Sequence, residues 1–133
     1  FEVKIAELAK EFQLEEYLNE PAKSLSHGQQ QWLEIAMAMA VDPILLLLDE
    51  PTAALGVAQT EQVLNLVRRL ADNGLAVVLI SHNLNDVFEV ADNIAALYLG
   101  QMAAQVEKKD VKPQQVIELI TTGKSAGVSG VNA

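Results

Sequence analysis

Two short apolar runs separated by a helical pattern constrain the fold of this chain more than any other feature. The runs are residues 44–48 and 75–80, each flanked by helix-breaking or turn-forming residues. Between them, residues 57–72 place apolar side chains on one helical face, at Val63, Leu64, Val67, Leu70 and Ala71. Two buried strands joined by a helix form a parallel pair with a right-handed crossover. The pattern therefore predicts an α/β fold built on a parallel sheet.

Helices and a hairpin are predicted on either side of this unit. An amphipathic helix is expected over 4–12, a shorter one over 14–18, and a third over 29–40 with Ser26 as its N-cap. After the second strand the patterns predict a helix over 83–91, a hairpin of strands 94–99 and 102–106, and a helix over 113–121. The expected fold is thus a parallel sheet with flanking helices, a helical N-terminal segment and a C-terminal hairpin.

Composition excludes several classes of function. The net charge of −9 repels phosphate backbones, so non-specific nucleic-acid binding is not expected. With no cysteine there is no disulfide framework, thiolate nucleophile or zinc–cysteine site, and a cytoplasmic location is the default expectation. The apolar runs are far shorter than the roughly 18 residues that span a bilayer. The sequence begins Phe1-Glu2-Val3-Lys4 without a secretory signal, which indicates a cut edge.

Chemically active side chains follow both predicted strands. Asp49 and Glu50 come directly after the first, and Ser81 and His82 after the second. Ligands of parallel α/β sheets gather outside the carboxyl ends of the strands, so these groups are expected at one site. Two plainer interpretations stay open from the residues alone: the acids cap a strand before the Pro51 turn, and His82 is a surface or helix-capping histidine.

The order of three motifs along the chain favours the ligand-site interpretation. Residues 25–29 (Leu-Ser-His-Gly-Gln) open a helix, residues 45–48 lead into Asp49-Glu50-Pro51-Thr52, and Ser81-His82 follows the next strand. In this order the motifs resemble those of the ATP-binding cassette (ABC) transporter ATPases, over nearly the whole chain. The resemblance implies a partial P-loop NTPase-like sheet. It also implies that 1–24 end the helical subdomain, that 25–123 form the C-terminal part of the ATPase core, and that 124–133 are a flexible tail.

The resemblance also implies roles for individual residues. Asp49 would order Mg²⁺ through water, Glu50 would be the general base, and His82 would contact the γ-phosphate. The signature loop would grip ATP held by a second ATPase subunit, in a homo- or heterodimer, through residues Ser26, His27, Gly28 and Gln29. The implied partners are that subunit and membrane-spanning permease subunits, with no nucleic acid. The implied location is cytoplasmic and peripheral on the inner face of the cell membrane.

Two residues depart from the family pattern. His27 occupies a position where Gly is usual in the family. A His at this position resembles cassettes of the urea and branched-chain amino acid importer type. Gly56 replaces an Asp that couples the two sites of the dimer, which puts that coupling in doubt. From Asp49 to Val106 the sequence looks most like sugar importers. A mosaic origin, natural or engineered, is one hypothesis for this combination.

The 133 residues contain no Gly-x-x-x-x-Gly-Lys-Ser/Thr loop for the β-phosphate. The tetrapeptide at 122–125 imitates its end, but Glu118 stands where the first Gly is required, so Gly123 is expected to terminate a helix. We expect the chain to be the C-terminal part of the energy-coupling ATPase of an importer for a sugar or similar small polar solute. By itself this part is expected not to hydrolyse ATP. The alternatives are a non-catalytic interaction module and a chimeric structural fragment. An uncovered sheet edge and helix face also predict self-association.

Overall fold

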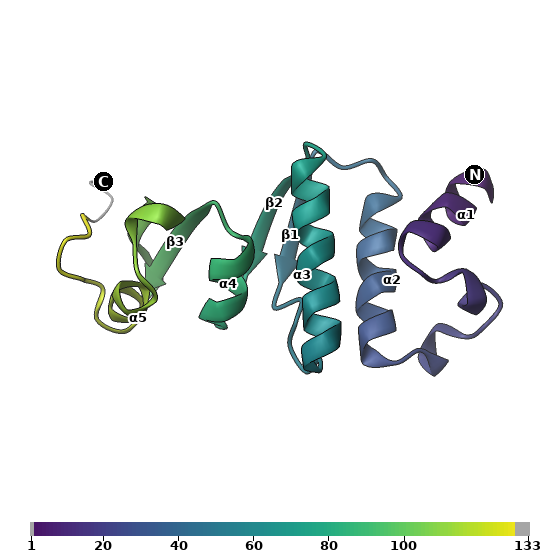
Figure 1. Ribbon diagram of the computed structural model, residues 1–133, viewed down its shortest axis with the longest axis horizontal. Helices are drawn as coiled ribbons and strands as arrows, with labels where there is room; N and C mark the ends of the chain where they lie inside the picture. Colours follow the sequence, from purple (N-terminus) through teal and green to yellow (C-terminus); the bar gives the residue numbers. More distant parts are fainter. Residues whose placement is uncertain (1, 130–133) are drawn as a thin grey trace. The chain divides into compact units, whose positions relative to one another are not determined.

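The computed structural model describes residues 2–129, and the chain forms two compact units (Figure 1). The first unit ends at His82 and the second begins at Asn83. Across 2–129, no helix combines the length and the apolar character needed to cross a bilayer.

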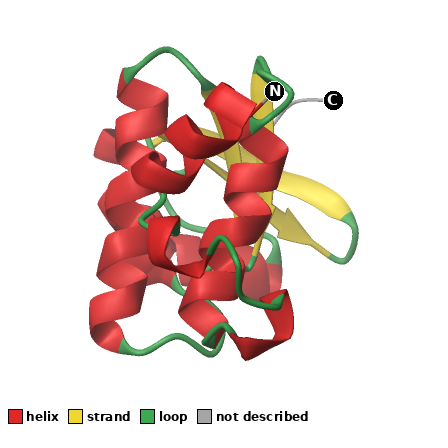
Figure 2. Ribbon diagram, turned by 90° about the vertical axis from the view of Figure 1, so that its right-hand side faces the viewer, coloured by secondary structure: helices red, strands yellow, loops and turns green. Residues whose placement is uncertain are grey.

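Helices supply most of the regular structure of the first unit (Figure 2). In chain order its elements are α1 (Glu2–Glu11), 3₁₀ turns at Glu15–Tyr17 and Ala22–Ser24, α2 (His27–Met39), β1 (Leu45–Asp49), α3 (Val57–Asp72) and β2 (Ala76–Ile80). The predicted bounds of α3 are confirmed, because Asn73 and Gly74 end the helix as expected. The N-cap of α2 is Ser26, also as predicted.

β1 and β2 form the predicted parallel pair, with Leu47 opposite Val78 and Asp49 opposite Ile80. One face of the pair is buried and carries Leu46 and Leu48. The other face, which we call the open face, consists of apolar side chains that are 47 to 66% exposed: Leu45, Leu47, Val78 and Ile80. The prediction that both strands are buried is therefore wrong for this face. A continuous apolar run predicts cover on both faces, whereas the described residues cover one.

The core of the first unit lies between the buried strand face and the helices. α3 packs against β2 and buries four predicted residues, Val63, Leu64, Val67 and Leu70. Ala71 was predicted on this face but is exposed, and Leu66 is buried instead, so the buried stripe is rotated toward Leu66. Phe12 and Trp32 pack edge to face, with ring centroids 6.0 Å apart. This contact ties the residue after α1 to α2.

The second unit contains α4 (Leu84–Val90), β3 (Asn93–Tyr98), β4 (Gln101–Glu107), a 3₁₀ turn at Lys108–Asp110 and α5 (Pro113–Thr122). β3 and β4 form the predicted antiparallel hairpin. Its two-residue loop, Leu99 and Gly100, has φ values of 47° and 78°. The hairpin packs against α5, with Ile94, Val111 and Val116 at the centre of one core cluster.

Gly123 ends α5 in the left-handed conformation, with a φ of 77°. The prediction that residues 122–125 mark a helix end is confirmed. Beyond it, the Ser125 hydroxyl donates to the Glu118 carboxylate and Gln115 donates to the Ala126 carbonyl. Of the predicted tail, residues 130–133 lie outside the described part of the chain.

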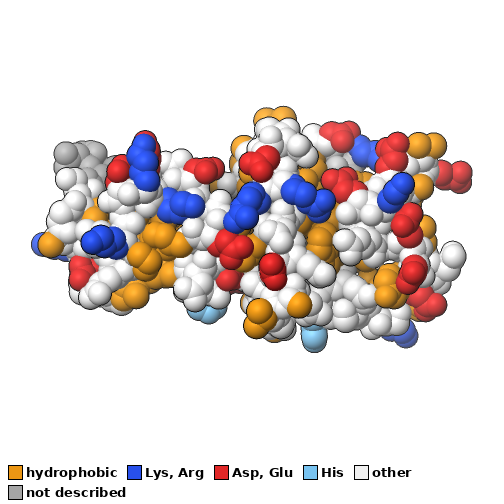
Figure 3. Space-filling view, in the orientation of Figure 1, with side chains coloured by type: hydrophobic (Ala, Val, Ile, Leu, Met, Phe, Trp, Pro, Cys, Tyr) orange, Lys and Arg blue, Asp and Glu red, His pale blue; other side chains and the backbone are white. Residues whose placement is uncertain are grey.

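Acidic side chains are scattered over the face of the molecule seen in Figure 3, with basic and apolar side chains between them. This distribution agrees with a solvated acidic surface, as the spread of acidic residues along the sequence predicts.

Candidate functional site

Glu50 occupies a constrained position directly after β1. Its φ of 48° lies in the left-handed region, which side chains other than Gly, Asn and Asp seldom adopt. The Glu50 N–H donates to the Ile80 carbonyl oxygen at 2.8 Å, which extends the pairing of β1 with β2 by one residue. The end of β2 thus fixes the backbone of Glu50.

The Glu50 carboxylate contacts His82, the residue two positions after β2. Its Oε1 accepts from the His82 backbone N–H at 3.0 Å and lies 2.8 Å from the His82 Nδ1. The Glu50 side chain is 33% exposed and the His82 side chain 85% exposed. The two residues meet because parallel strands bring their carboxyl ends to the same edge of the sheet.

These contacts lower the pKa of Glu50 below its ordinary value. The side-chain hydrogen bond from His82 is the largest cause; partial burial opposes it, and the His82 backbone N–H, the His82 charge and Ser81 add to the lowering. Glu50 is therefore ionised at neutral pH and can only accept hydrogen bonds. It follows that His82 Nδ1 carries a proton in this pair.

Asp49 lies on the open face, because side chains alternate along β1 and those of Leu45 and Leu47 point the same way. Its side chain is exposed, and among residues 2–129 it makes no hydrogen bond or ion pair with Glu50 or His82. The described residues contain no group of three or more His, Asp and Glu side chains that could hold a metal ion. One uncommitted carboxylate fits Mg²⁺, which keeps several waters and takes its other ligands from phosphates.

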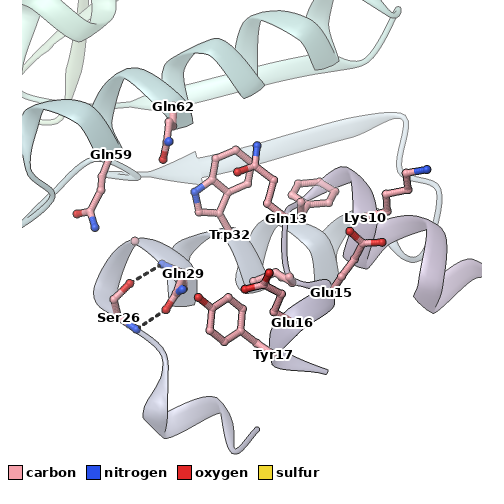
Figure 4. A pocket seen from close by; sticks show the side chains of 13 residues that line it. Lys10, Gln13, Glu15, Glu16, Tyr17, Ser26, Gln29, Trp32, Gln59 and Gln62 are labelled. Carbon is pink, nitrogen blue, oxygen red and sulfur yellow. Dashed lines mark hydrogen bonds between the residues drawn. The ribbon is translucent and has the colours of Figure 1, made fainter. Parts of the chain in front are cut away.

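The start of α2 has a complete capping box. The Gln29 N–H donates to the Ser26 hydroxyl at 3.4 Å, and the Ser26 N–H donates to the Gln29 side chain at 2.9 Å (Figure 4). Of the first free N–H groups of the helix, those of His27 and Gly28 have no acceptor among the described contacts. These two donors and the helix dipole favour an anion at this point.

A cavity of about 470 Å³ lies beside these donors. Its walls come from the end of α1, the 3₁₀ turn that follows, and the N-terminal halves of α2 and α3 (Figure 4). Tyr17, Gln59 and Gln62 line it, and none of the three was predicted as a site residue. Gln59 carries one signal that could have found it: it stands three residues after the N-cap of α3, as Gln29 does in α2.

The predicted site residues thus form two groups. Glu50 and His82 are in contact, and Ser26, Gly28 and Gln29 form the start of α2. His27 lies between the latter at the first helical position, with its side chain exposed. Among the described contacts, no hydrogen bond or ion pair joins the two groups.

Comparison with known proteins gives consistent results. Residues 1–53 match the family model for "ABC transporter". The chain is 39% identical over 107 residues to the fructose import ATP-binding protein FrcA of Rhizobium meliloti. It is 41% identical over 98 residues to the xylose import ATP-binding protein XylG of Moorella thermoacetica. A solved nucleotide-free ATP-binding cassette from an ABC transporter matches with a TM-score of 0.77 and 26% identity.

The alignments with FrcA, XylG and the solved cassette cover most of this chain and a smaller share of each known protein. The alignments include 80% of the chain and 41% of FrcA, and 74% of the chain and 19% of XylG. The structural match covers 88% of the chain and 48% of the solved cassette. The chain therefore spans less than half the length of the relatives that it matches.

Proposed function

Because this chain belongs to the ABC transporter ATPases, we propose that it supplies the signature loop and the Glu–His pair of an importer ATPase for a sugar or similar small polar solute. The contact between Glu50 and His82 carries the proposal. The names of the relatives FrcA and XylG support import of a sugar. The working assembly would include a second ATPase subunit and membrane-spanning permease subunits, with the ATPase on the cytoplasmic face.

Glu50 and His82 would act on one nucleotide. Glu50 is ionised and would take a proton from the attacking water as general base. His82 donates from Nδ1 to Glu50, so its Nε2 can donate to a phosphate oxygen only when the ring is protonated. Asp49 would hold Mg²⁺ through water, and the ion would stabilise charge on the phosphates.

The start of α2 would act on a second nucleotide, held by the other subunit. The unpaired N–H groups of His27 and Gly28 would donate to its γ-phosphate, and Ser26 and Gln29 would keep the first turn in place. Segments 1–24, 25–123 and 124–133 would then be the end of a helical subdomain, the C-terminal part of the core and a tail.

The 133 residues are expected to release no phosphate from MgATP by themselves, because they lack a loop to bind and orient the β-phosphate. The measurement is phosphate release by the chain and by its Glu50→Gln variant. Turnover that disappears in the variant would contradict this expectation and would indicate a nucleotide pocket assembled in another way.

Nucleotide contact at α2 is tested by ¹⁵N-resolved NMR of the labelled chain mixed with an unlabelled intact ABC ATPase, with MgATP and with MgADP. We expect the His27 and Gly28 amides to shift more with MgATP, which carries the γ-phosphate. Equal shifts with both nucleotides, or none, would argue against the signature assignment. The alternative of a non-catalytic interaction module predicts MgATP-dependent pairing of the chain with an intact ABC ATPase, without added turnover.

A further inference from the structure

Gln59 contacts both the turn that precedes α3 and the first turn of α2. It lies in the first turn of α3, where its Oε1 accepts from the Gly56 N–H at 3.4 Å. Its amide also packs on Gly28 in the first turn of α2. A Cβ placed on Gly28 would lie 3.0 Å from both the Cδ and the Nε2 of Gln59. Figure 4 shows the Gln59 side chain reaching toward this turn.

The absence of a side chain at Gly28 makes this contact possible. Gly28 is buried and Gln59 is half-buried, so the amide of Gln59 fills the space that a larger residue at position 28 would take. Gly28 also carries one of the two N–H groups without an acceptor at the start of α2. Gln59 therefore packs against the residue that carries this donor.

The Oε1 of the same Gln59 amide reaches the turn that follows Glu50. Residues 51–56 connect Glu50 to α3, and Gly56 is the N-cap of that helix. Gly56 has no side chain, so the link runs through its backbone N–H. A displacement of this turn would move the Gln59 amide, and with it the surface on which Gly28 rests.

We propose that Gln59 is a positioning residue that couples the turn after Glu50 to the phosphate-facing amides of α2. The inference rests on the proposed function, since it assumes that His27 and Gly28 face a phosphate. A neutral amide suits this place, because it accepts from Gly56 without adding negative charge beside an anion site. A carboxylate of the same shape would keep the hydrogen bond and oppose the anion.

The test compares Gln59→Glu with Gln62→Glu. Gln62 lies one turn further along α3 and lines the same cavity, so the control makes the same charge change without the contact to Gly28. The probe is MgATP in the presence of the same unlabelled intact ABC ATPase, and the readout is the apparent Kd from the His27 and Gly28 amide shifts. We expect Gln59→Glu to weaken binding about three- to fivefold, and Gln62→Glu by less than about twofold at the same ionic strength. Equal weakening by both variants would overturn the inference.

A second experiment tests the coupling without nucleotide. Gly28→Ala should force Gln59 aside and so change the chemical shift and hydrogen exchange of the Gly56 amide. In a Gln59→Ala background the same substitution should leave Gly56 unaffected. Urea unfolding of each variant establishes that it is folded. A Gly56 response of the same size in both backgrounds would overturn the link.

The two experiments separate this inference from the proposed function. Absence of any MgATP response at His27 and Gly28 in the unsubstituted chain would count against the proposed function, and with it against a phosphate-positioning role. A normal response that is unchanged in both Gln59→Glu and Gln59→Ala would leave the proposed function standing and remove Gln59 from it.

Discussion

Glu50 places an acidic side chain in a backbone region that favours glycine. Its φ of 48° carries a cost of about 1–3 kcal/mol for a residue with a Cβ. The hydrogen bonds to Ile80 and His82 hold the residue there. Neither the conformation nor the cost could be predicted from the sequence, because both arise from pairing with a strand 30 residues away. The meeting of Glu50 with His82 could be predicted, since it follows from two parallel strands that end together.

The stability that the Glu50–His82 pair contributes should decrease at acid pH. The pKa of Glu50 is lower in the folded chain than in the unfolded chain, chiefly because of the hydrogen bond from the His82 side chain. Its contribution to stability is complete above the unfolded pKa and is lost as the pH falls through the folded pKa. His82→Ala removes the largest cause of the lowering, so the titration midpoint of Glu50 should rise toward its ordinary value. ¹³C NMR of the Glu50 carboxyl carbon measures this midpoint.

His27→Ala is the matched control for this titration, because it removes the chain's other histidine without touching Glu50. The Glu50 midpoint should be the same in His27→Ala as in the unsubstituted chain. A midpoint unmoved by His82→Ala would show that the hydrogen bond does not set the acidity of Glu50.

Three helices of this chain begin with the same type of side-chain cap. In α2, α3 and α5 a glutamine side chain accepts from the backbone N–H three residues earlier, at Ser26, Gly56 and Lys112. Local signals of this kind explain why helix positions and the hairpin could be predicted. The contact of Gln59 with Gly28 could not, because it depends on how two helices separated by a strand pack together. The exposure of the open face could not be predicted, because a continuous apolar run places apolar side chains on both faces of a strand and does not show which face is covered.

The β3–β4 hairpin has a loop residue that suits its backbone poorly. Leu99 is 84% exposed with a φ of 47°, and the following Gly100 also has a positive φ, as in the tight turns that prefer Asn-Gly. Leu99→Asn should stabilise the second unit by about 0.5–1 kcal/mol, because Asn adopts this conformation more readily. Urea unfolding followed by hydrogen exchange of the β3 and β4 amides measures the gain.

Leu99→Ala serves as the control, since it removes the exposed apolar side chain but keeps the Cβ. Its gain should be smaller than that of Leu99→Asn. If the two variants were equally stable, exposure of the leucine rather than backbone strain would be the dominant effect.

At the scale of the whole molecule, the open face is the feature in which this chain departs from a typical parallel sheet. Parallel sheets are usually covered on both faces. Here Leu47 and Val78 lie opposite each other and stay exposed. The matched cassette structure is about twice the length that this chain aligns to. Contact of a second polypeptide with the open face would bury these apolar side chains.

Self-association through this face is therefore expected in the purified 133 residues. Leu47→Lys and Val78→Thr should each lower it, and sedimentation velocity over a range of concentrations measures the effect. Val57→Lys is the control, because Val57 is 88% exposed but lies at the start of α3 and outside the open face. A chain that stays monomeric at all concentrations would contradict the expectation.

Asp49 shares the open face with these leucines, which links assembly to hydration of its carboxylate. Polypeptide that buried Leu47 and Val78 would also displace water beside Asp49 and lower the local dielectric constant. Attraction between a carboxylate and a divalent cation strengthens steeply as the effective dielectric constant falls. In the proposed role of Asp49 as an Mg²⁺ ligand, this attraction is opposed by the cost of removing water from both charges. The Mg²⁺ affinity of Asp49 would then change when the sheet is covered, so that ion binding and assembly become coupled.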